Sequence, residues 1–376
     1  MEVKILLYGL LATSGLYFMV ILIITIGWYR IKYFALPSRN INTTVSVIIA
    51  YRNENKQLPV LMNDLLKQNF PEQKLEIIMV NDHSTDDSKK IVEKFLKKTN
   101  HLKLIDATAT GKKNALKEGV KIASGELIIS TDADCRLPKN WLLNITAFYE
   151  KEHPLVVFGP VVYEKEKNLK QKFFSLDFLS LVASGAGSAG IGLPLMGNGA
   201  NIAFEKEMFL QSEKQIQKSK YASGDDVFLM HFVNKKYGSD KIMFIKNKAC
   251  IVKTKSPSNF KEFIEQRARW GSKAKGYELM WPLFVAFTVF FFNTLLIFSV
   301  VIGVFIPWLF FLFFLFVVFK YLTDLPLLIE FGNFTGKRSL INYLFPFEFL
   351  YPFYLVFAAV KGIFFSYKWK DRKNLK

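Results

Sequence analysis

Residues 45–50, Val-Ser-Val-Ile-Ile-Ala, and residues 76–82, Glu-Ile-Ile-Met-Val-Asn-Asp, decide the fold of this 376-residue chain. Each run is rich in β-branched apolar residues and leads into polar ones, and a helical stretch beginning near Leu58 separates them. The alternation continues with helical stretches at 86–98 and 112–123 and with strands at 102–105 and 127–131. Strands that alternate with helices predict βαβ units, and therefore an α/β fold with a mainly parallel sheet.

The composition of the chain indicates a membrane protein. Hydrophobic residues make up 51% of it, and Lys plus Arg outnumber Asp plus Glu by 50 to 32, which gives a net charge of +18. Positive charge beside apolar runs orients membrane proteins and meets anionic lipid, so this balance favours membrane lipid as a partner over nucleic acid. The apolar content excludes a disordered chain, and two cysteines, Cys135 and Cys250, are too few for a disulfide scaffold.

Three segments are apolar enough to enter a membrane. Residues 5–29 carry no charge and can cross a hydrocarbon core of about 30 Å, so residues 1–30 are expected to form an N-terminal transmembrane helix. Residues 279–319 also carry no charge and contain Pro307, which predicts a transmembrane hairpin over 279–320. The third segment, 341–366, contains Glu348 and Lys361, so it could cross the membrane, re-enter it or lie in the interface.

Basic residues at the ends of these segments predict the orientation of the chain. Arg30 and Lys32 follow the first segment, while Lys273 and Lys320 flank the hairpin. Because basic residues concentrate on the cytoplasmic side, we expect an integral protein of the inner, or cytoplasmic, membrane. Residues 40–257 would then form a cytoplasmic domain.

Polar side chains follow the predicted strands, at the edge where open parallel sheets bind ligands. They are Tyr51, Arg52 and Glu54 after the first strand, Asp82 after the second, and Asp132 and Asp134 after the fourth. Asp132 and Asp134 are two residues apart, so in extended chain both side chains point to one side and could approach one hard cation. The alternative is a turn in which Asp caps the next helix. Mg²⁺ binds through one or two carboxylates plus substrate phosphates, so a phosphorylated substrate would accompany it.

Two predicted helices begin with charged residues. Asp225 and Asp226 precede an apolar run, and they are either ordinary first-turn residues favoured by the helix dipole or the source of a general base. Lys112 follows Gly111 at a helix start, which is either a place for an anionic group or a solvated helix end. Residues 197–201, Gly-Asn-Gly-Ala-Asn, follow a Gly/Ser-rich stretch and are expected to form a flexible loop.

Residues 258–278 form a basic amphipathic stretch just before the hairpin. On a helix, Gln266, Arg269 and Trp270 stand at i, i+3 and i+4 and share one face. Arg offers a planar fork for phosphate, and Trp offers a stacking surface. A membrane-surface helix that uses Arg and Trp as anchors is the alternative, and both interpretations can hold at once.

In this order the motifs resemble those of the family 2 glycosyltransferases, in the membrane-bound branch that includes cellulose, chitin and hyaluronan synthases and ceramide glucosyltransferases. The resemblance runs from residue 45 to residue 270. It rests on Ile-Ile-Ala-Tyr-Arg-Asn-Glu at 48–54, Val-Asn-Asp-His-Ser-Thr-Asp at 80–86, Gly-Lys-x-x-Ala-Leu at 111–116, Asp-Ala-Asp at 132–134, Gly-Asp-Asp at 224–226 and Gln-x-x-Arg-Trp at 266–270. The family implies a GT-A fold and sugar transfer with inversion.

The resemblance also implies a role for each site residue. Ala50, Tyr51 and Glu54 would hold the nucleoside of the donor, Asp82 would bind its base, and Lys112 would lie near the nucleotide. Asp132 and Asp134 would carry the diphosphate through Mg²⁺ or Mn²⁺. Asp226 would be the general base. Asp225 stands where the family has Glu, and because the Asp side chain is shorter, the role of Asp225 stays open. Gln266, Arg269 and Trp270 would close on the diphosphate and the acceptor.

The function predicted is transfer of a sugar from a nucleotide-sugar donor, expected to be a UDP-sugar, to a lipid-linked or cell-envelope glycan acceptor. The alternative is a processive polysaccharide synthase, which three or four apolar helices could support only as a homo-oligomer or with an accessory subunit, because extrusion needs a polar tunnel. A non-catalytic membrane scaffold and a nucleotidyltransferase on a similar sheet are further alternatives, although all the expected carboxylates weigh against the scaffold.

Overall fold

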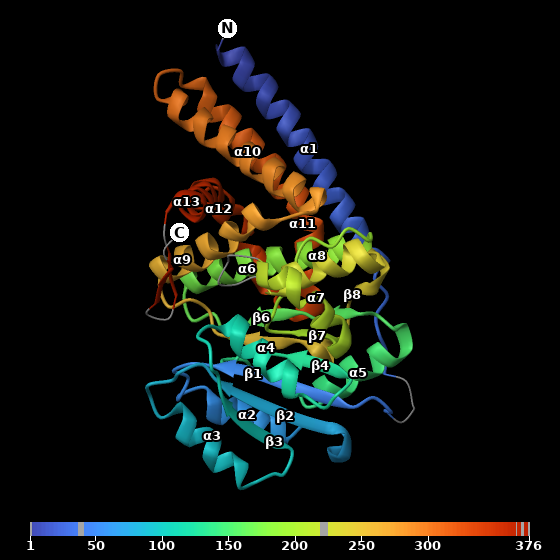
Figure 1. Cartoon of the computed structure of the whole chain (residues 1–376). Helices are drawn as coiled ribbons and strands as arrows, with labels where there is room; N and C mark the ends of the chain where they lie inside the picture. Colours follow the sequence, from blue (N-terminus) through green and yellow to red (C-terminus); the bar gives the residue numbers. More distant parts are fainter. Residues whose placement is uncertain (1, 37–40, 219–224, 366, 370–371, 375–376) are drawn as a thin grey trace. The chain divides into compact units, whose positions relative to one another are not determined.

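The computed structural model describes residues 2–36, 41–218, 225–365, 367–369 and 372–374, which Figure 1 colours along the chain. They divide into two compact units. The sheet unit comprises residues 31–164 and 196–255, and the membrane unit comprises residues 1–30, 165–195 and 256–376. The sequence predicts a single catalytic domain at 40–257, but residues 165–195 within that range belong to the membrane unit.

The sheet unit is built on a seven-stranded sheet with strand order β3-β2-β1-β4-β7-β5-β8. The strands are β1 (Val45–Tyr51), β2 (Leu75–Asn81), β3 (Leu102–Asp106), β4 (Leu127–Ser130), β5 (Val156–Phe158), β7 (Ile202–Glu205) and β8 (Ile242–Phe244). The first four run parallel, whereas β7 is antiparallel to β4 and to β5. A separate parallel pair joins β6 (Val161–Tyr163) to β9 (Val252–Thr254). The predicted α/β class with a mainly parallel sheet is confirmed.

Helices follow the strands as βαβ units require (Figure 1). They are α2 (Leu58–Leu66), α3 (Ser88–Leu96), α4 (Lys112–Ile122), α5 (Trp141–Glu152), α7 (Lys206–Lys218) and α8 (Asp225–Tyr237), with 3₁₀ turns at Glu72–Lys74, Ser239–Lys241 and Lys248–Cys250. Gly119 lets α4 pack directly on the sheet, because a Cβ there would lie 2.6 Å from Cγ2 of Ile48.

The register of the parallel strands brings their carboxyl ends together. Tyr51 at the end of β1 lies opposite Asn81, and Asn81 lies opposite Asp106 at the end of β3. Residues 45–49 are buried throughout, so β1 lies in the centre of the core. The loops that follow these ends therefore share one edge, and that edge is where ligands bind in such sheets.

Three helices of the membrane unit lie side by side (Figure 1). They are α1 (Glu2–Arg30), α10 (Met280–Gly303) and α11 (Trp308–Thr335), and each is long and apolar enough to span a membrane. Leu10, Phe292 and Leu309 belong to the buried cluster that joins them. Phe287 and Phe311 are among the large apolar side chains that stay exposed, as expected for helices surrounded by lipid.

The third predicted membrane segment is a broken helix. A 3₁₀ turn (Arg338–Tyr343) and α12 (Leu344–Glu348) form its first half, and α13 (Tyr351–Phe364) forms the second. The halves meet at 83°, which is the geometry of a broken span or of a re-entrant loop. The unit also contains α6 (Leu169–Gly190), α9 (Phe260–Gly271), a 3₁₀ turn (Ser272–Gly276), β10 (Tyr367–Trp369) and β11 (Arg372–Asn374).

The helix α11 continues past residue 320, the predicted end of the hairpin, to Thr335. Lys320 lies inside this helix, where its ammonium donates to Asp324 at 2.7 Å and to Glu348 at 2.6 Å. The two carboxylates compensate the charge of Lys320. A lysine that is compensated in this way no longer marks the edge of a membrane segment.

The Gly/Ser-rich residues before the predicted loop form the end of α6, a helix that packs on α1. A Cβ at Gly187 would lie 2.2 Å from the carbonyl oxygen of Ile24, and one at Gly27 would lie 1.9 Å from the carbonyl oxygen of Gly187. Both helices therefore need glycine where their backbones meet. Small residues at a helix contact are typical of membrane proteins.

Candidate active site

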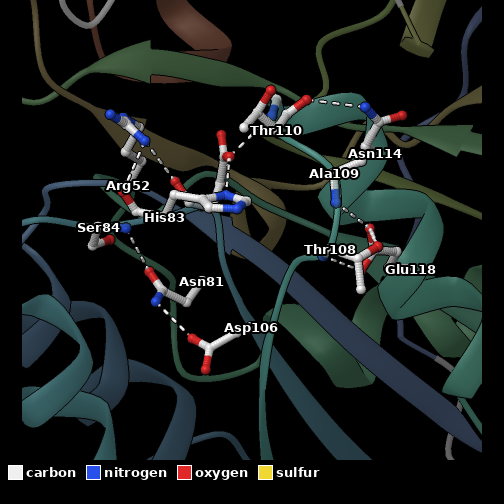
Figure 2. Close-up of polar contacts among 12 residues, drawn as sticks. Arg52, Asn81, His83, Ser84, Asp106, Thr108, Ala109, Thr110, Asn114 and Glu118 are labelled. Carbon is white, nitrogen blue, oxygen red and sulfur yellow. Dashed lines mark hydrogen bonds and ion pairs between the residues drawn. The ribbon is translucent and has the colours of Figure 1, made fainter.

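The loops after β1 and β2 are joined by a set of hydrogen bonds at the ligand edge of the sheet. Arg52 donates through Nη1 to the carbonyl oxygens of Asp82, at 3.0 Å, and of His83, at 2.8 Å (Figure 2). Oδ1 of Asn53 accepts from the backbone N–H of Thr85 at 2.8 Å. Asn53 and His83 adopt left-handed φ values of 51° and 55°, so both loops are held in a specific, uncommon conformation.

Asp82, the predicted base-binding residue, follows β2, and its side chain contacts the residue that precedes α4. Its Oδ1 accepts from the backbone N–H of Gly111 at 2.9 Å and lies 3.3 Å from Nδ1 of His83, and the residue is 2% exposed. Gly111 has a φ of 109°, which only glycine adopts easily. Asp82 therefore fixes the position of the α4 N-terminus, where Lys112 follows.

The loop between β3 and α4 is fixed by Glu118, a residue that the sequence did not single out. Its carboxylate accepts from the N–H of Thr108 at 2.8 Å and from the N–H of Ala109 at 3.1 Å (Figure 2). Burial alone would raise the pKa of Glu118, but these hydrogen bonds hold it below its usual value. In the same region Asn81 donates to Asp106 at 2.8 Å. Glu118 stands seven residues into α4 with no local motif around it, so the sequence offers no signal for this role.

The predicted nucleoside contacts differ in accessibility. Ala50 and Glu54 are half-buried, whereas the side chain of Tyr51 is 1% exposed and packs beneath the loops. Burial, and after it the negative charges of Asp106, Glu93 and Asp86, raise the pKa of Tyr51, so its hydroxyl stays protonated.

Asp132 and Asp134 follow β4 as predicted, and both side chains are half-buried. Lys112 forms an ion pair with Oδ1 of Asp132, and Oδ2 of Asp134 accepts from the hydroxyl of Thr254 at 3.2 Å. Cys135 lies beside them, and burial together with the charges of both carboxylates raises the pKa of its thiol well above the usual value.

These residues suit a divalent cation whose remaining ligands are supplied by the substrate. Among the described residues no group of three or more His, Cys, Asp or Glu side chains could hold a metal alone. Mg²⁺ needs fewer, because it binds through one or two carboxylates together with substrate phosphates. The ammonium of Lys112 against Asp132 shows that a cationic group is accepted at this point.

Asp226 is connected to the end of β4 through the loop 197–201. Its Oδ2 accepts from the N–H of Gly199 at 3.1 Å, and its Oδ1 accepts from the N–H of Val227 at 2.9 Å. The next loop residue, Ala200, accepts at 2.8 Å from the hydroxyl of Thr131, which immediately precedes Asp132. The structure therefore brings Asp226 and the Asp132 segment to the same loop. The side chain of Asp225, and Gly224 as a whole, lie outside the described residues.

Comparison with known proteins places the chain in a family. Residues 127–357, more than half of the chain, match the profile of the Glycosyl transferase family group 2, and residues 46–190 match that of Glycosyl transferase family 2. The chain belongs to the family 2 glycosyltransferases.

Among curated proteins, this glycosyltransferase is 33% identical over 130 residues to the poly(ribitol-phosphate) beta-N-acetylglucosaminyltransferase TarS of Staphylococcus aureus, which is 34% of the chain and 23% of that relative. It is 29% identical over 135 residues to the beta-monoglucosyldiacylglycerol synthase of a Nostoc species, which is 35% of the chain and 28% of that relative. The matched part thus spans about a quarter of each relative.

Among solved structures, the glycosyltransferase is similar in fold to the mannosyltransferase PcManGT of Pyrobaculum calidifontis, which was determined in complex with GDP-Man and Mn²⁺. The TM-score is 0.62 at 17% identity, and the match covers 95% of this chain and 98% of that one. This likeness supports the predicted GT-A-like fold with apolar terminal helices.

The remaining predicted residues of this family 2 glycosyltransferase lie in the membrane unit. Gln266, Arg269 and Trp270 belong to α9 and are half-buried, as the predicted helix requires. Between them stands Arg267, which is buried and which the sequence did not single out.

Proposed function

We propose that the chain is an inverting, metal-dependent glycosyltransferase that moves a sugar from a nucleotide-diphosphate sugar to a lipid or cell-envelope glycan at a membrane surface. The observation that carries the proposal is the connection from Thr131, beside Asp132, through the loop 197–201 to Asp226. The same loop thus contacts Asp226, which suits a general base, and the segment that carries Asp132, which suits a diphosphate site.

The donor half of the site would hold a diphosphate. Asp132 and Asp134 would bind Mg²⁺ or Mn²⁺, which when bound stabilises the negative charge that develops on the leaving diphosphate. Lys112 lies against Asp132 and would contribute its own positive charge to the same phosphates. The loops held by Asp82, Arg52 and Glu118 would form the nucleoside pocket.

The acceptor half would use Asp226 as general base. Both carboxylate oxygens of Asp226 accept backbone N–H groups, from Gly199 and Val227, and these bonds hold the carboxylate in place at the start of α8. The acceptor oxygen would form its bond to the anomeric carbon as the bond to the nucleotide diphosphate breaks, and its proton would pass to Asp226. A single displacement inverts the anomeric carbon.

A membrane acceptor is supported by the three helices that are long and apolar enough to span a bilayer. The basic residues that flank them favour a cytoplasmic position for the sheet unit. PcManGT was solved with GDP-Man, so the proposed UDP-sugar specificity must be tested against GDP-sugars.

The test uses membranes that contain the full chain, incubated with labelled UDP-glucose, UDP-GlcNAc and GDP-mannose. We expect one donor to label a lipid or glycan fraction, and chelation of divalent metal to abolish the labelling. Asp226→Asn should lower turnover by about 100-fold or more while nucleotide binding persists, because it removes the base and not the donor site. Asp134→Ala should instead weaken metal-dependent nucleotide binding.

The matched control is Asp240→Asn, which removes an exposed carboxylate of the sheet unit outside the site. It should behave as wild type. Near-normal turnover in Asp226→Asn would refute the base, and unchanged nucleotide affinity in Asp134→Ala would refute the metal site. A ladder of long products would favour the processive synthase, and no transfer from any donor would favour the scaffold.

A further inference from the structure

The Gln-x-x-Arg-Trp segment of α9 is built around a buried guanidinium. Arg267 is 8% exposed, and its Nε donates to Oδ2 of Asp177, on α6, at 2.5 Å. Nη2 forms an ion pair with the same oxygen. The hydroxyl of Tyr354, on α13, donates to the other oxygen of Asp177. A charge this deeply buried is tolerated only with such partners, so the position of Arg267 is strongly determined.

Arg267 contacts two of the three motif residues. Its Nη1 donates to Oε1 of Gln266 at 2.6 Å, and its Cζ lies 4.5 Å from the ring centroid of Trp270. The same carbon lies 4.5 Å from the ring of Phe263, one turn earlier. The guanidinium therefore fixes the orientation of Gln266 and the plane of Trp270 at once.

The contact with Gln266 decides which end of its amide points away from Arg267. A guanidinium has donors and no acceptor, so Gln266 must turn its oxygen toward it. The NH₂ group is then the far end of the amide, and that group can only donate. Its natural ligand is an oxygen, such as a phosphate or sugar oxygen.

The broken membrane helix holds this arrangement in place. Besides Tyr354, α13 supplies Lys361, whose ammonium donates to Glu265 at 2.5 Å. It also supplies Gly362, where a Cβ would lie 2.4 Å from the carbonyl oxygen of Ala268 on α9. α13 and α9 are therefore in backbone contact beside the motif.

We propose that Arg267, anchored by Asp177 and Tyr354, is a positioning residue that orients Gln266 as a hydrogen-bond donor to a substrate oxygen and holds Trp270 in its plane. This inference rests on the proposed transferase function. It assigns to α13 the task of supporting the Gln-x-x-Arg-Trp segment.

The decisive variant is Gln266→Glu. A carboxylate would still accept from Arg267, and more strongly, but it could not donate to a substrate oxygen. We expect a loss of kcat/KM of about 10- to 100-fold with the yield of folded protein unchanged, which is the usual range for a lost hydrogen bond to a charged group. Activity within about threefold of wild type would overturn the donor role.

The positioning role is tested by a double-mutant cycle between Arg267 and Gln266. Arg267→Met should lower kcat/KM about 10-fold or more, and the double variant with Gln266→Leu should be little worse than Gln266→Leu alone, because Arg267 acts partly through Gln266. Arg267→Lys should recover part of the loss, since an ammonium also donates. Lys361→Met is the matched control, because it breaks a different ion pair of α9, the one with α13, without touching Gln266.

The outcomes separate the two proposals. Fully additive losses, or a loss in Lys361→Met equal to that in Arg267→Met, would overturn the positioning role while the transferase function stands. A wild-type chain that transfers sugar from no donor would overturn both.

Discussion

Replacing Lys320 by methionine should destabilise the membrane unit more than removal of any exposed charge. Lys320 lies within α11 and is 1% exposed, and it pairs with Asp324 on the same helix and with Glu348 at the end of α12. The hydroxyl of Tyr17, on α1, lies 2.6 and 2.8 Å from the two oxygens of Asp324 and donates its one proton to that carboxylate. After the substitution Asp324 retains a donor from Tyr17, so Glu348 suffers the larger loss.

The magnitude follows from burial. Removing one partner of a buried ion pair costs about 3 to 5 kcal/mol. The remaining carboxylate can escape by taking up a proton, and because a glutamic acid in water is half-protonated near pH 4.3, this limits the cost to about 4 kcal/mol at pH 7 and about 2 kcal/mol at pH 5.5. Glu348 is 3% exposed, so water cannot replace the lost ammonium.

The assay is thermal unfolding of the purified full chain in detergent at pH 7 and pH 5.5. Lys320→Met should lower the transition temperature by several degrees at pH 7 and by less at pH 5.5. Adding Glu348→Gln should restore more stability than adding Asp324→Asn. The control is Lys337→Met, which breaks a more accessible pair with Glu166 and should therefore cost less. Equal shifts for Lys320→Met at both pH values, or for the two second-site changes, would refute this reasoning.

Three further outcomes are expected. Gly187→Leu should lower the transition temperature in detergent, since any side chain there meets the carbonyl of Ile24 and overpacking costs about 1 to 3 kcal/mol; an unchanged transition would contradict the helix contact. Asp82→Ala should weaken nucleotide binding about 10-fold in calorimetric titrations, because the N–H of Gly111 loses its acceptor; equal affinity would exclude that loop from the site. Burial alone would raise the pKa of Glu76, but hydrogen bonds from neighbouring side chains and backbone hold it below its ordinary 4.5, so this stabilisation exists above pH 4.5 and is lost as the pH falls further. Thermal unfolding across pH 3 to 7 should therefore show Glu76→Gln less stable than wild type at pH 7, with the gap closing in acid, and a constant gap would contradict the assignment.

Much of the sheet could be predicted because short segments of sequence determine its strands and helices. Strand runs such as 45–50 alternate with helices, and that pattern predicts a mainly parallel sheet with Asp132 and Asp134 at its ligand edge. The connection of Asp226 to that edge could not be predicted, because it depends on backbone contacts with Gly199 across 27 residues of chain.

The membrane unit was harder to predict because its determinants are long-range. Lys320 looks like the end of an apolar segment until Glu348, 28 residues later, is placed beside it. Arg267 occupies an unspecified position of its motif, and its importance depends on Asp177, 90 residues earlier. Neither relationship leaves a period or a spacing that a single sequence reveals.

The position of α6 within the chain has a consequence for synthesis and for fragments. The strands β1 to β6 precede α6, and β7, which pairs with both β4 and β5, follows it. A ribosome therefore delivers α1 and then α6 before the sheet can be completed, so these two helices can meet before the sheet unit is whole. A soluble fragment cut at residues 31 and 255 would carry α6 without α1, α9 and α13, which would leave Gly187, Phe173 and Phe174 uncovered. Such a fragment should aggregate unless residues 165–195 are replaced by a short polar linker.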